Sequence, residues 1–178
     1  KMYDLAVETA LAASAQNIVT ETPEDAKYLI EYLKVNKIGR VTFLPITSVR
    51  PREQIYEVKS ALSEKGALGI ANEIVTYDKK FENIISNLLG NTLIVDTLEN
   101  ATNIAKKYRF VFKIVTLDGD VLSTQGSMTG GSRRQDTVGL LSSDRKIEEN
   151  AKILEEKNKE MEKLKINVED IAKNYNEV

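Results

Sequence analysis

The sequence contains no cysteine and no histidine. Without cysteine the chain cannot form a disulfide, offer a thiolate to a metal or use a cysteine nucleophile. Without histidine it lacks the most common catalytic base and the most common zinc ligand. Any catalytic or metal site would have to be built from other side chains.

Long apolar runs are missing as well. No run approaches the roughly 20 residues needed to span a bilayer, and no basic segment followed by an apolar one opens the chain as in a secretory signal. We therefore expect a cytoplasmic protein with no membrane contact. Because the first residue is Lys1 rather than Met, we also expect a piece cut from a longer chain.

The composition that remains is that of a globular domain. The chain has 178 residues, 42% of them apolar, which is enough for a sizeable core. A net charge of −2 and a charged content of 29% exclude a histone-like polycation and a disordered acidic chain. Aromatic residues make up only 6%, so an exposed platform for stacked bases is not expected.

The end of the chain differs from the rest. Residues 141–178 hold ten acidic and eight basic residues, whereas all nine glycines and all three prolines lie before residue 140. A segment rich in Glu and Lys and free of Gly and Pro is typical of a long exposed helix. We therefore divide the chain into a globular domain, residues 1–140, and a helical segment, residues 141–178.

Apolar residues in the helical segment repeat every seven positions. In a heptad, positions a and d face a partner helix, and here Asn150 and Lys157 weaken the first two d positions. One interpretation is an amphipathic helix docked on its own domain; the period of seven and the charged remaining faces favour a coiled coil. Its partner helix would have been cut away or would come from another molecule. The predicted seam consists of Ile147, Leu154, Met161, Leu164, Val168, Ile171 and Tyr175.

Residues 1–140 read as alternating strands and helices. Thr22 followed by Pro23 is a strong helix start, with a capping hydroxyl and proline at the first helical position. Asp78 is expected to cap another helix that ends at Gly90, and Asp118-Gly119 predicts a tight hairpin. Helices are predicted at 3–15, after Thr22, around residues 55–62, after Asp78 and at 98–108. Strands are predicted at 17–20, 40–44, 73–77, 92–96, 110–117 and 121–122.

A short internal echo suggests two related lobes. Residues 18–26 align with residues 93–101, with Thr, Glu and Ala shared and most other pairs conservative. Both copies read as a strand that runs into a capped helix. The match is short enough to arise by coincidence; if it is meaningful, it predicts two similar α/β lobes.

One glycine-rich stretch is a candidate site: Gly126, Ser127, Met128, Thr129, Gly130 and Gly131. It lacks the lysine and the following helix of a phosphate-binding loop. Glycine at a strand end also permits another backbone to approach closely. Close contact with a second protein segment is the favoured interpretation, and a phosphate cradle or a flexible loop are the alternatives.

Charged residues give no catalytic constellation. No carboxylate pair lies in an apolar setting, Asp118 and Asp120 fit ordinary turn chemistry, and no set of metal ligands is evident. Basic residues gather near the ends of the predicted hairpin. Lys106 and Lys107 either complement a helix C-terminus or belong with the others to a DNA-binding patch. The candidate DNA-binding residues are Lys106, Lys107, Arg109, Arg133 and Arg134.

Several stretches resemble the hinge domain of bacterial SMC (structural maintenance of chromosomes) proteins. The most specific is the run from Ile114 to Val121, Ile-Val-Thr-Leu-Asp-Gly-Asp-Val, leading into the glycine stretch at 126–131. Residues 42–45, 66–71 and 88–95 also fit. The sequence departs from the family at 11–14, where a Leu-Gly pair is usual, and at Thr124-Gln125, where Pro-Gly is more frequent; both departures concern local turns.

The resemblance implies an α/β (α+β) hinge of two similar lobes of mixed sheets and helices. It implies a homodimer in which strands of one lobe meet the opposite lobe of the partner, with the glycine stretch at the contact. The helical segment would belong to a coiled-coil arm whose N-terminal arm helix is absent from this chain.

The resemblance also implies that the fragment is not an enzyme and binds no metal or cofactor. In the parent, ATP and Mg would bind a distant head domain of a protein that condenses and segregates chromosomes, associated with the nucleoid in the cytoplasm. Weak, non-specific DNA contact is an additional expectation. The alternative function is a ligand-sensing α/β regulatory domain with a coiled-coil transmitter, which a saturable response to a small molecule would distinguish.

Overall fold

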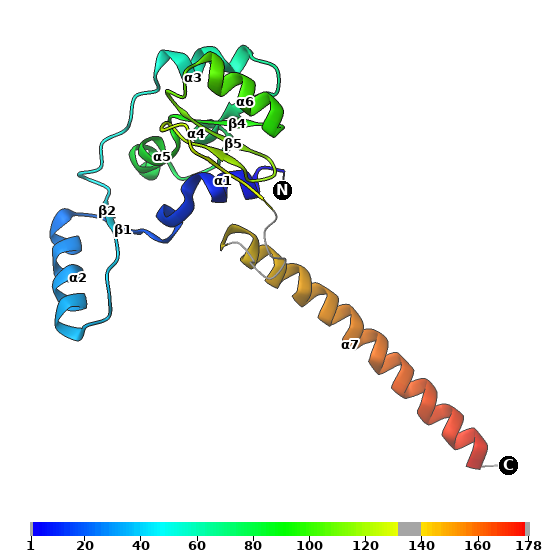
Figure 1. Ribbon diagram of the computed structural model, residues 1–178. Helices are drawn as coiled ribbons and strands as arrows, with labels where there is room; N and C mark the ends of the chain where they lie inside the picture. Colours follow the sequence, from blue (N-terminus) through cyan, green and yellow to red (C-terminus); the bar gives the residue numbers. More distant parts are fainter. Residues whose placement is uncertain (1, 132–139, 177–178) are drawn as a thin grey trace. The chain divides into compact units, whose positions relative to one another are not determined.

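The computed structural model describes residues 2–131 and 140–176, which belong to two separate units of the chain (Figure 1). The first unit contains every strand of the described chain, arranged in two sheets. The described part of the second unit is one helix, α7 (Leu140–Asn176), of 37 residues. The mixed sheets and helices confirm the predicted α+β class, and α7 confirms the predicted long helix.

The first lobe is a small βαβ unit. Strand β1 (Ile18–Thr20) leads into helix α2 (Pro23–Asn36), and β2 (Phe43–Pro45) returns parallel to β1 with Ile18 opposite Phe43. The predicted helix start is confirmed, because the Thr22 hydroxyl accepts a hydrogen bond from Asp25 N–H at 3.2 Å while the Asp25 carboxylate accepts one from Thr22 N–H. The helix ends at Asn36 and is capped by Lys37, which adopts the left-handed conformation two residues before Gly39.

The second lobe is built on a five-stranded sheet. Its strands, in their order across the sheet, are β3 (Ala67–Ile70), β4 (Thr92–Val95), β5 (Lys113–Thr116), β6 (Val121–Leu122) and β7 (Met128–Thr129). Helix α6 (Leu98–Lys107) connects β4 to β5, the two strands that run parallel, and the other neighbours are antiparallel.

Helices cover both faces of this sheet (Figure 1). On one face, Leu93 and Ile114 pack with α6 and with α3 (Tyr56–Ser60), which continues into the 3₁₀ turn η2 (Ala61–Ser63). On the other, Ile94 and Val115 pack with α1 (Asp4–Leu11), α4 (Ala71–Ile74) and α5 (Glu82–Leu89). Alternate residues of β4 thus enter separate cores, and burial on both faces explains the unbroken apolar run at 93–95.

The internal echo corresponds to a shared motif. In both lobes a parallel βαβ unit starts its helix with a threonine cap, and Thr97 in the second lobe accepts from Asn100 N–H at 3.3 Å, as Thr22 does from Asp25. The lobes differ in size, since the first has two strands and the second has five.

Three local predictions were wrong. Residues 73–77 are not a strand: α4 makes one turn that buries Ala71 and places Ile74 against Gly69, while the strand lies earlier at Ala67–Ile70. The first helix ends at Leu11 rather than at residue 15, and the 3₁₀ helix η1 (Ala12–Gln16) follows it.

The third error concerns both ends of the helix that was predicted from Asp78 to Gly90. Asp78 caps a short 3₁₀ turn, η3 (Lys79–Phe81), ahead of α5, and Gly90 keeps right-handed helical angles. Glycine is needed there for space, since a Cβ would lie 2.4 Å from the Ser86 carbonyl oxygen.

Candidate dimerisation surface

The glycine stretch forms a turn and the last strand of the sheet. Gly126 adopts a left-handed φ of 80° in a turn closed by hydrogen bonds from Gly126 N–H to Ser123 O and from Ser123 N–H to Ser127 O. Residues 128–129 then form β7, a strand that sequence analysis did not predict. The motif therefore supplies the outermost strand of the five-stranded sheet, with β6 as its neighbour.

Among the described residues, strand β7 has no strand beside it on the side away from β6 and so presents an open edge. Because Ser123 and Ser127 are a hydrogen-bonded pair, the antiparallel alternation makes Leu122 and Met128 a non-hydrogen-bonded pair. The backbone N–H and C=O of Met128 are therefore directed away from β6. The side chains of Met128 and Thr129 are also exposed. An unpaired edge of this kind can accept another strand.

The two terminal glycines of the stretch serve different purposes. At Gly130 an added Cβ would lie 2.2 Å from the Asp120 carboxylate, which is held by Thr116. Gly131 has a left-handed φ of 127° and open space around it. The close approach at Gly130 is therefore made within the chain, and whether residues 126–131 also contact a second molecule stays a prediction.

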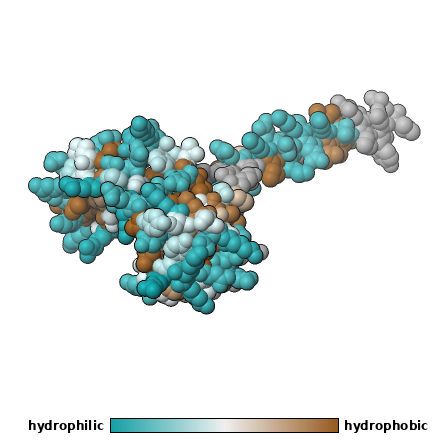
Figure 2. All heavy atoms as spheres, turned by 90° about the horizontal axis from the view of Figure 1, so that it is seen from above, coloured by the Kyte–Doolittle hydropathy of each residue, from teal (hydrophilic) through white to brown (hydrophobic). Residues whose placement is uncertain are grey.

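The first lobe is the second exposed surface. Parallel strands are normally covered on both faces, yet Ile18 and Val19 of β1 are 44% and 39% exposed, and Val41, just before β2, is 40% exposed. Ala26 is the buried apolar residue that α2 contributes. Apolar patches interrupt the hydrophilic surface of the first unit (Figure 2). Sequence analysis missed this surface, although the echo placed Ile18 and Val19 opposite residues that are buried in the second lobe.

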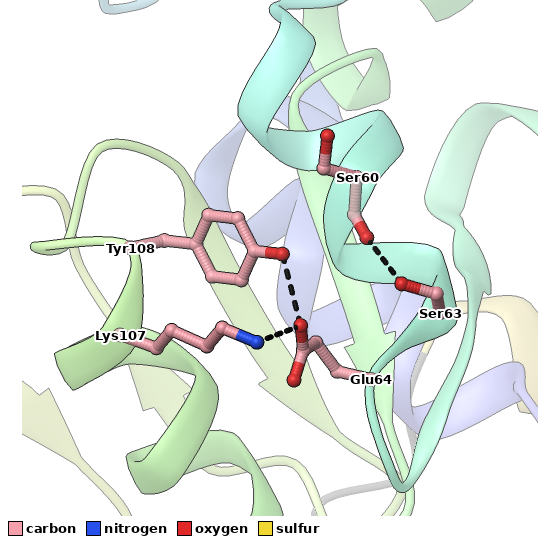
Figure 3. Close-up of polar contacts among 5 residues, drawn as sticks. All are labelled: Ser60, Ser63, Glu64, Lys107 and Tyr108. Carbon is pink, nitrogen blue, oxygen red and sulfur yellow. Dashed lines mark hydrogen bonds and ion pairs between the residues drawn. The ribbon is translucent and has the colours of Figure 1, made fainter.

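One of the predicted DNA-binding residues, Lys107, is hydrogen-bonded within the chain. Lys107 Nζ and the Tyr108 hydroxyl both donate to Glu64 Oε1, at 2.5 and 3.0 Å (Figure 3). The hydrogen bond from Lys107 is the main reason that the pKa of Glu64 is lowered, and the same bond raises the pKa of Lys107. Burial and the bond to Glu64 raise the pKa of Tyr108. The charge of Lys107 is thus engaged inside the chain.

Of the other predicted DNA-binding residues, Lys106 and Arg109 belong to the described part of the chain. Lys106 and Arg109 are exposed at the C-terminal end of α6, before β5 begins. The unpredicted strand β7 carries the chain back across the sheet, so that Gly131 follows the end opposite to the start of β5. The described members of the set lie at the C-terminal end of α6 or just after it. Arg133 and Arg134 lie outside the described residues, so the expectation of one basic face stays a prediction.

Helix α7 exposes its predicted seam. Ile147, Leu154 and Met161 are exposed along the helix, together with Leu164 and Val168. Hydrophobic side chains are spaced among hydrophilic ones along the helix (Figure 2). Ile171 and Tyr175 lie within α7, but their side chains are outside the described set.

The described residues contain no group of three or more acidic side chains arranged to hold a metal ion. Among the helices of the same residues, none has the length and apolar content needed to cross a bilayer. The features that stand out are therefore two open sheet surfaces and an exposed helical seam, which are typical of an assembly module.

Comparison with known proteins defines the class. The family model for the flexible hinge domain of SMC proteins matches residues 1–105, and the chain belongs to this family. The chain is 42% identical over 155 residues to the chromosome partition protein Smc of Bacillus subtilis, covering 86% of this chain and 13% of that protein. It is 38% identical to Smc of Mesomycoplasma hyorhinis, covering 99% of this chain and 18% of that protein. The chain thus spans less than a fifth of these relatives.

Solved hinge domains have the same fold. A crystal structure of an asymmetric dimer of the Geobacillus stearothermophilus SMC hinge domain matches with a TM-score of 0.75 at 36% identity, covering 93% of this chain and 66% of that one. The Pyrococcus furiosus Smc hinge domain with an extended coiled coil matches with a TM-score of 0.62 at 34% identity, covering 93% and 57%. These matches confirm the resemblance to an SMC hinge.

Proposed function

We propose that this hinge domain joins two copies of its parent protein by homodimerisation. One observation carries the proposal: the first unit has two incomplete sheet surfaces, the open edge of β7 and the exposed strands of the first lobe. A related hinge that crystallised as a dimer supports self-association. The glycine stretch, Gly126 to Gly131, supplies the strand β7 for this contact.

In the proposed dimer β7 of each protomer contacts the first lobe of the other. Each protomer contributes one β7 strand and one first lobe to the interface. Two equivalent contacts therefore form a closed dimer that does not continue into an open array. The contact would extend the sheet of one lobe across the interface and shield Ile18 and Val19 from water. Burial of each such side chain contributes about 1.5–3 kcal/mol.

The parent protein is proposed to act in chromosome partition, as the relatives' names state of them. Helix α7 would pair through its seam with an N-terminal arm helix, and ATP with Mg would bind in a head domain remote from this fragment. The fragment itself would have no catalytic role. Location in the cytoplasm with the nucleoid follows from this proposed role.

Single charge insertions at the two surfaces test the dimer. Val19→Glu in the first lobe and Met128→Glu in β7 should each convert the dimer to a monomer, because an unpaired buried charge costs several kcal/mol, about 3–5. Light scattering measures the change in mass. Val111→Glu is the matched control, since Val111 is exposed to a similar degree outside both surfaces, and it should stay dimeric. Gly130 is unsuitable for this test because any side chain there meets Asp120.

A mixing experiment identifies which surfaces meet. A Val19→Glu protomer keeps an intact β7, and a Met128→Lys protomer keeps an intact first lobe. If the opposite lobes meet, the mixture regains a heterodimer with one native contact and one Glu–Lys contact, although each variant alone is monomeric. A mixture that stays monomeric, or single variants that stay dimeric at low micromolar concentration, would contradict the proposed interface.

Weak DNA contact is an auxiliary part of the proposal. It rests on Lys106 and Arg109, which are exposed and have no carboxylate within ion-pair distance among the described residues. Lys107 contributes less because its ammonium is bound to Glu64.

A further inference from the structure

A cavity of about 480 Å³ lies beside the start of β5, and its lining includes neither residues of β7 nor residues of the first lobe. Residues from α5, from the segment that links the two lobes, from β5 and from the β6–β7 turn form its walls. Arg52 and Lys113 line it, whereas no Asp or Glu does. Leu88 and Phe112 provide apolar wall. Its volume is within the range of small-molecule sites.

Hydrogen bonds hold the backbone at Arg52 and the ammonium of Lys113. The Ser86 hydroxyl donates to Arg52 O at 3.1 Å, and Asn87 and Asn91 of the same region donate to the carbonyls of Arg50 and Glu53, at 3.0 and 2.9 Å. These bonds fix the linker segment along α5. Lys113 Nζ donates to Ala10 O at 2.7 Å, at the end of α1. The Lys113 ammonium and the backbone that carries Arg52 are thus positioned before any ligand arrives.

The charge of these residues is not neutralised by the chain. Within the described residues neither Arg52 nor Lys113 has an ion pair with a carboxylate, and the one hydrogen-bond partner of the Lys113 ammonium is a neutral carbonyl. Lys113 is half-buried, and burial lowers the pKa of its ammonium. A half-buried cation without a counter-charge favours a bound anion.

We propose that this cavity binds a small organic anion through a phosphate group held between Arg52 and Lys113. Arginine matches the planar, two-point geometry of an oxyanion, and lysine adds a point charge. The apolar wall suits a ligand with a carbon skeleton rather than a bare ion. The site joins the lobe linker and the end of α1 to the central sheet, and it does not depend on the proposed dimer.

The experiment uses calorimetric titration of the full chain with inorganic phosphate and with pyrophosphate, against chloride at the same ionic strength. We expect saturable binding of pyrophosphate with a dissociation constant of about 1 mM or below. Arg52→Gln and Lys113→Gln should each weaken it about tenfold or more. Lys59→Gln removes an exposed charge that does not line this cavity and should change nothing.

Several results would overturn the site. Binding that does not saturate, or that is equal in Arg52→Gln, means that Arg52 holds no anion. If a short DNA duplex displaces pyrophosphate with the same dependence on both residues, the cavity edge contacts a nucleic-acid backbone instead. If Lys113→Gln unfolds because the bond to Ala10 is lost, the pyrophosphate affinity of Arg52→Gln still tests the proposed site. The molecular mass by light scattering is read in parallel, so that failure here is separate from failure of the dimer.

Discussion

At the scale of the residue, Gly130 is restricted by its own chain. A Cβ at this position would meet the Asp120 carboxylate at 2.2 Å, and Asp120 is itself tied to Thr116 by three hydrogen bonds. Gly130→Ala is therefore expected to lower the free energy of unfolding by about 1–3 kcal/mol, measured by urea denaturation. Asp120→Ala in the same chain should recover part of this loss. Equal costs with and without Asp120 would show that the contact is not the cause.

The Glu64 cluster gives the stability a pH dependence. The folded pKa of Glu64 is lowered, so its contribution is present above the pKa of the unfolded state and is lost as the pH falls through the folded value. The folded pKa of Lys107 is raised, so its contribution is present below the unfolded pKa and is lost as the pH rises through the folded value.

Glu64→Gln should reduce the loss of stability both at acidic pH and at alkaline pH. The expected result is a smaller fall of the thermal midpoint between about pH 5 and pH 3 than in the parent chain, together with a weaker alkaline limb. Glu57→Gln, on the exposed turn of α3, is a matched control. The acid limb does not vanish entirely, because hydrogen bonding to Asn100 also lowers the pKa of Asp96. Profiles that coincide for parent and variant would show that the cluster does not contribute.

At the scale of the element, α7 and the first unit differ in how they are stabilised. The exposed seam of α7 has no partner helix among the described residues, and its ion pairs are exposed pairs within the helix, such as Lys159 with Glu155. Such pairs contribute about 0.3–0.5 kcal/mol each. The cores of the second lobe consist of residues before 123.

Deleting residues 145–178 should therefore leave the first unit folded. The thermal midpoint and the dimer mass are expected to change little, as measured by circular dichroism and light scattering. The isolated segment should be only partly helical until a partner helix is added, because the first two d positions are Asn150 and Lys157. Collapse of the truncated chain would instead show that α7 docks on its own domain.

At the scale of the whole molecule, charge limits contact with DNA. Residues 1–140 carry 17 acidic and 17 basic residues, so any attraction has to be local. We expect weak, sequence-independent binding whose affinity falls with salt at a slope of about −0.9 per phosphate contact. Lys106→Glu should weaken binding to every sequence, and Lys107→Glu should have the smaller effect because Lys107 is paired with Glu64.

Fluorescence anisotropy at two salt concentrations measures this binding. Reversal of Lys106 and Arg109 together is the strongest test, and Lys59→Glu is the matched control on α3. Binding that ignores salt, or that survives the double reversal unchanged, would remove these residues from the proposed contact. The dimer proposal does not depend on the result.

The sequence by itself determined the elements with strong local signals. Thr22 and Thr97 cap helices wherever the rest of the chain lies, because a hydroxyl reaches an N–H three residues away. Residues 92–96 were predicted as a strand, and the heptads predicted α7. The family, and with it the expectation of a dimer, followed from the motif at 114–121 and the glycine stretch.

Tertiary structure decided what depends on distant residues. Residues 73–77 have strand-forming composition, but packing of Ile74 against Gly69 and the second core makes α4 a helical turn. The sequence around Met128 shows no strand, and β7 exists because β6 provides its hydrogen-bonding partners. The sequence gives no sign that Lys107 is paired, because its partner Glu64 is 43 positions away and reaches the ammonium only in the folded chain. Local rules fix helix caps, periodicity and the ion pairs within α7, whereas sheet edges, long-range pairs such as Lys107 with Glu64, and cavities arise only when separate segments meet.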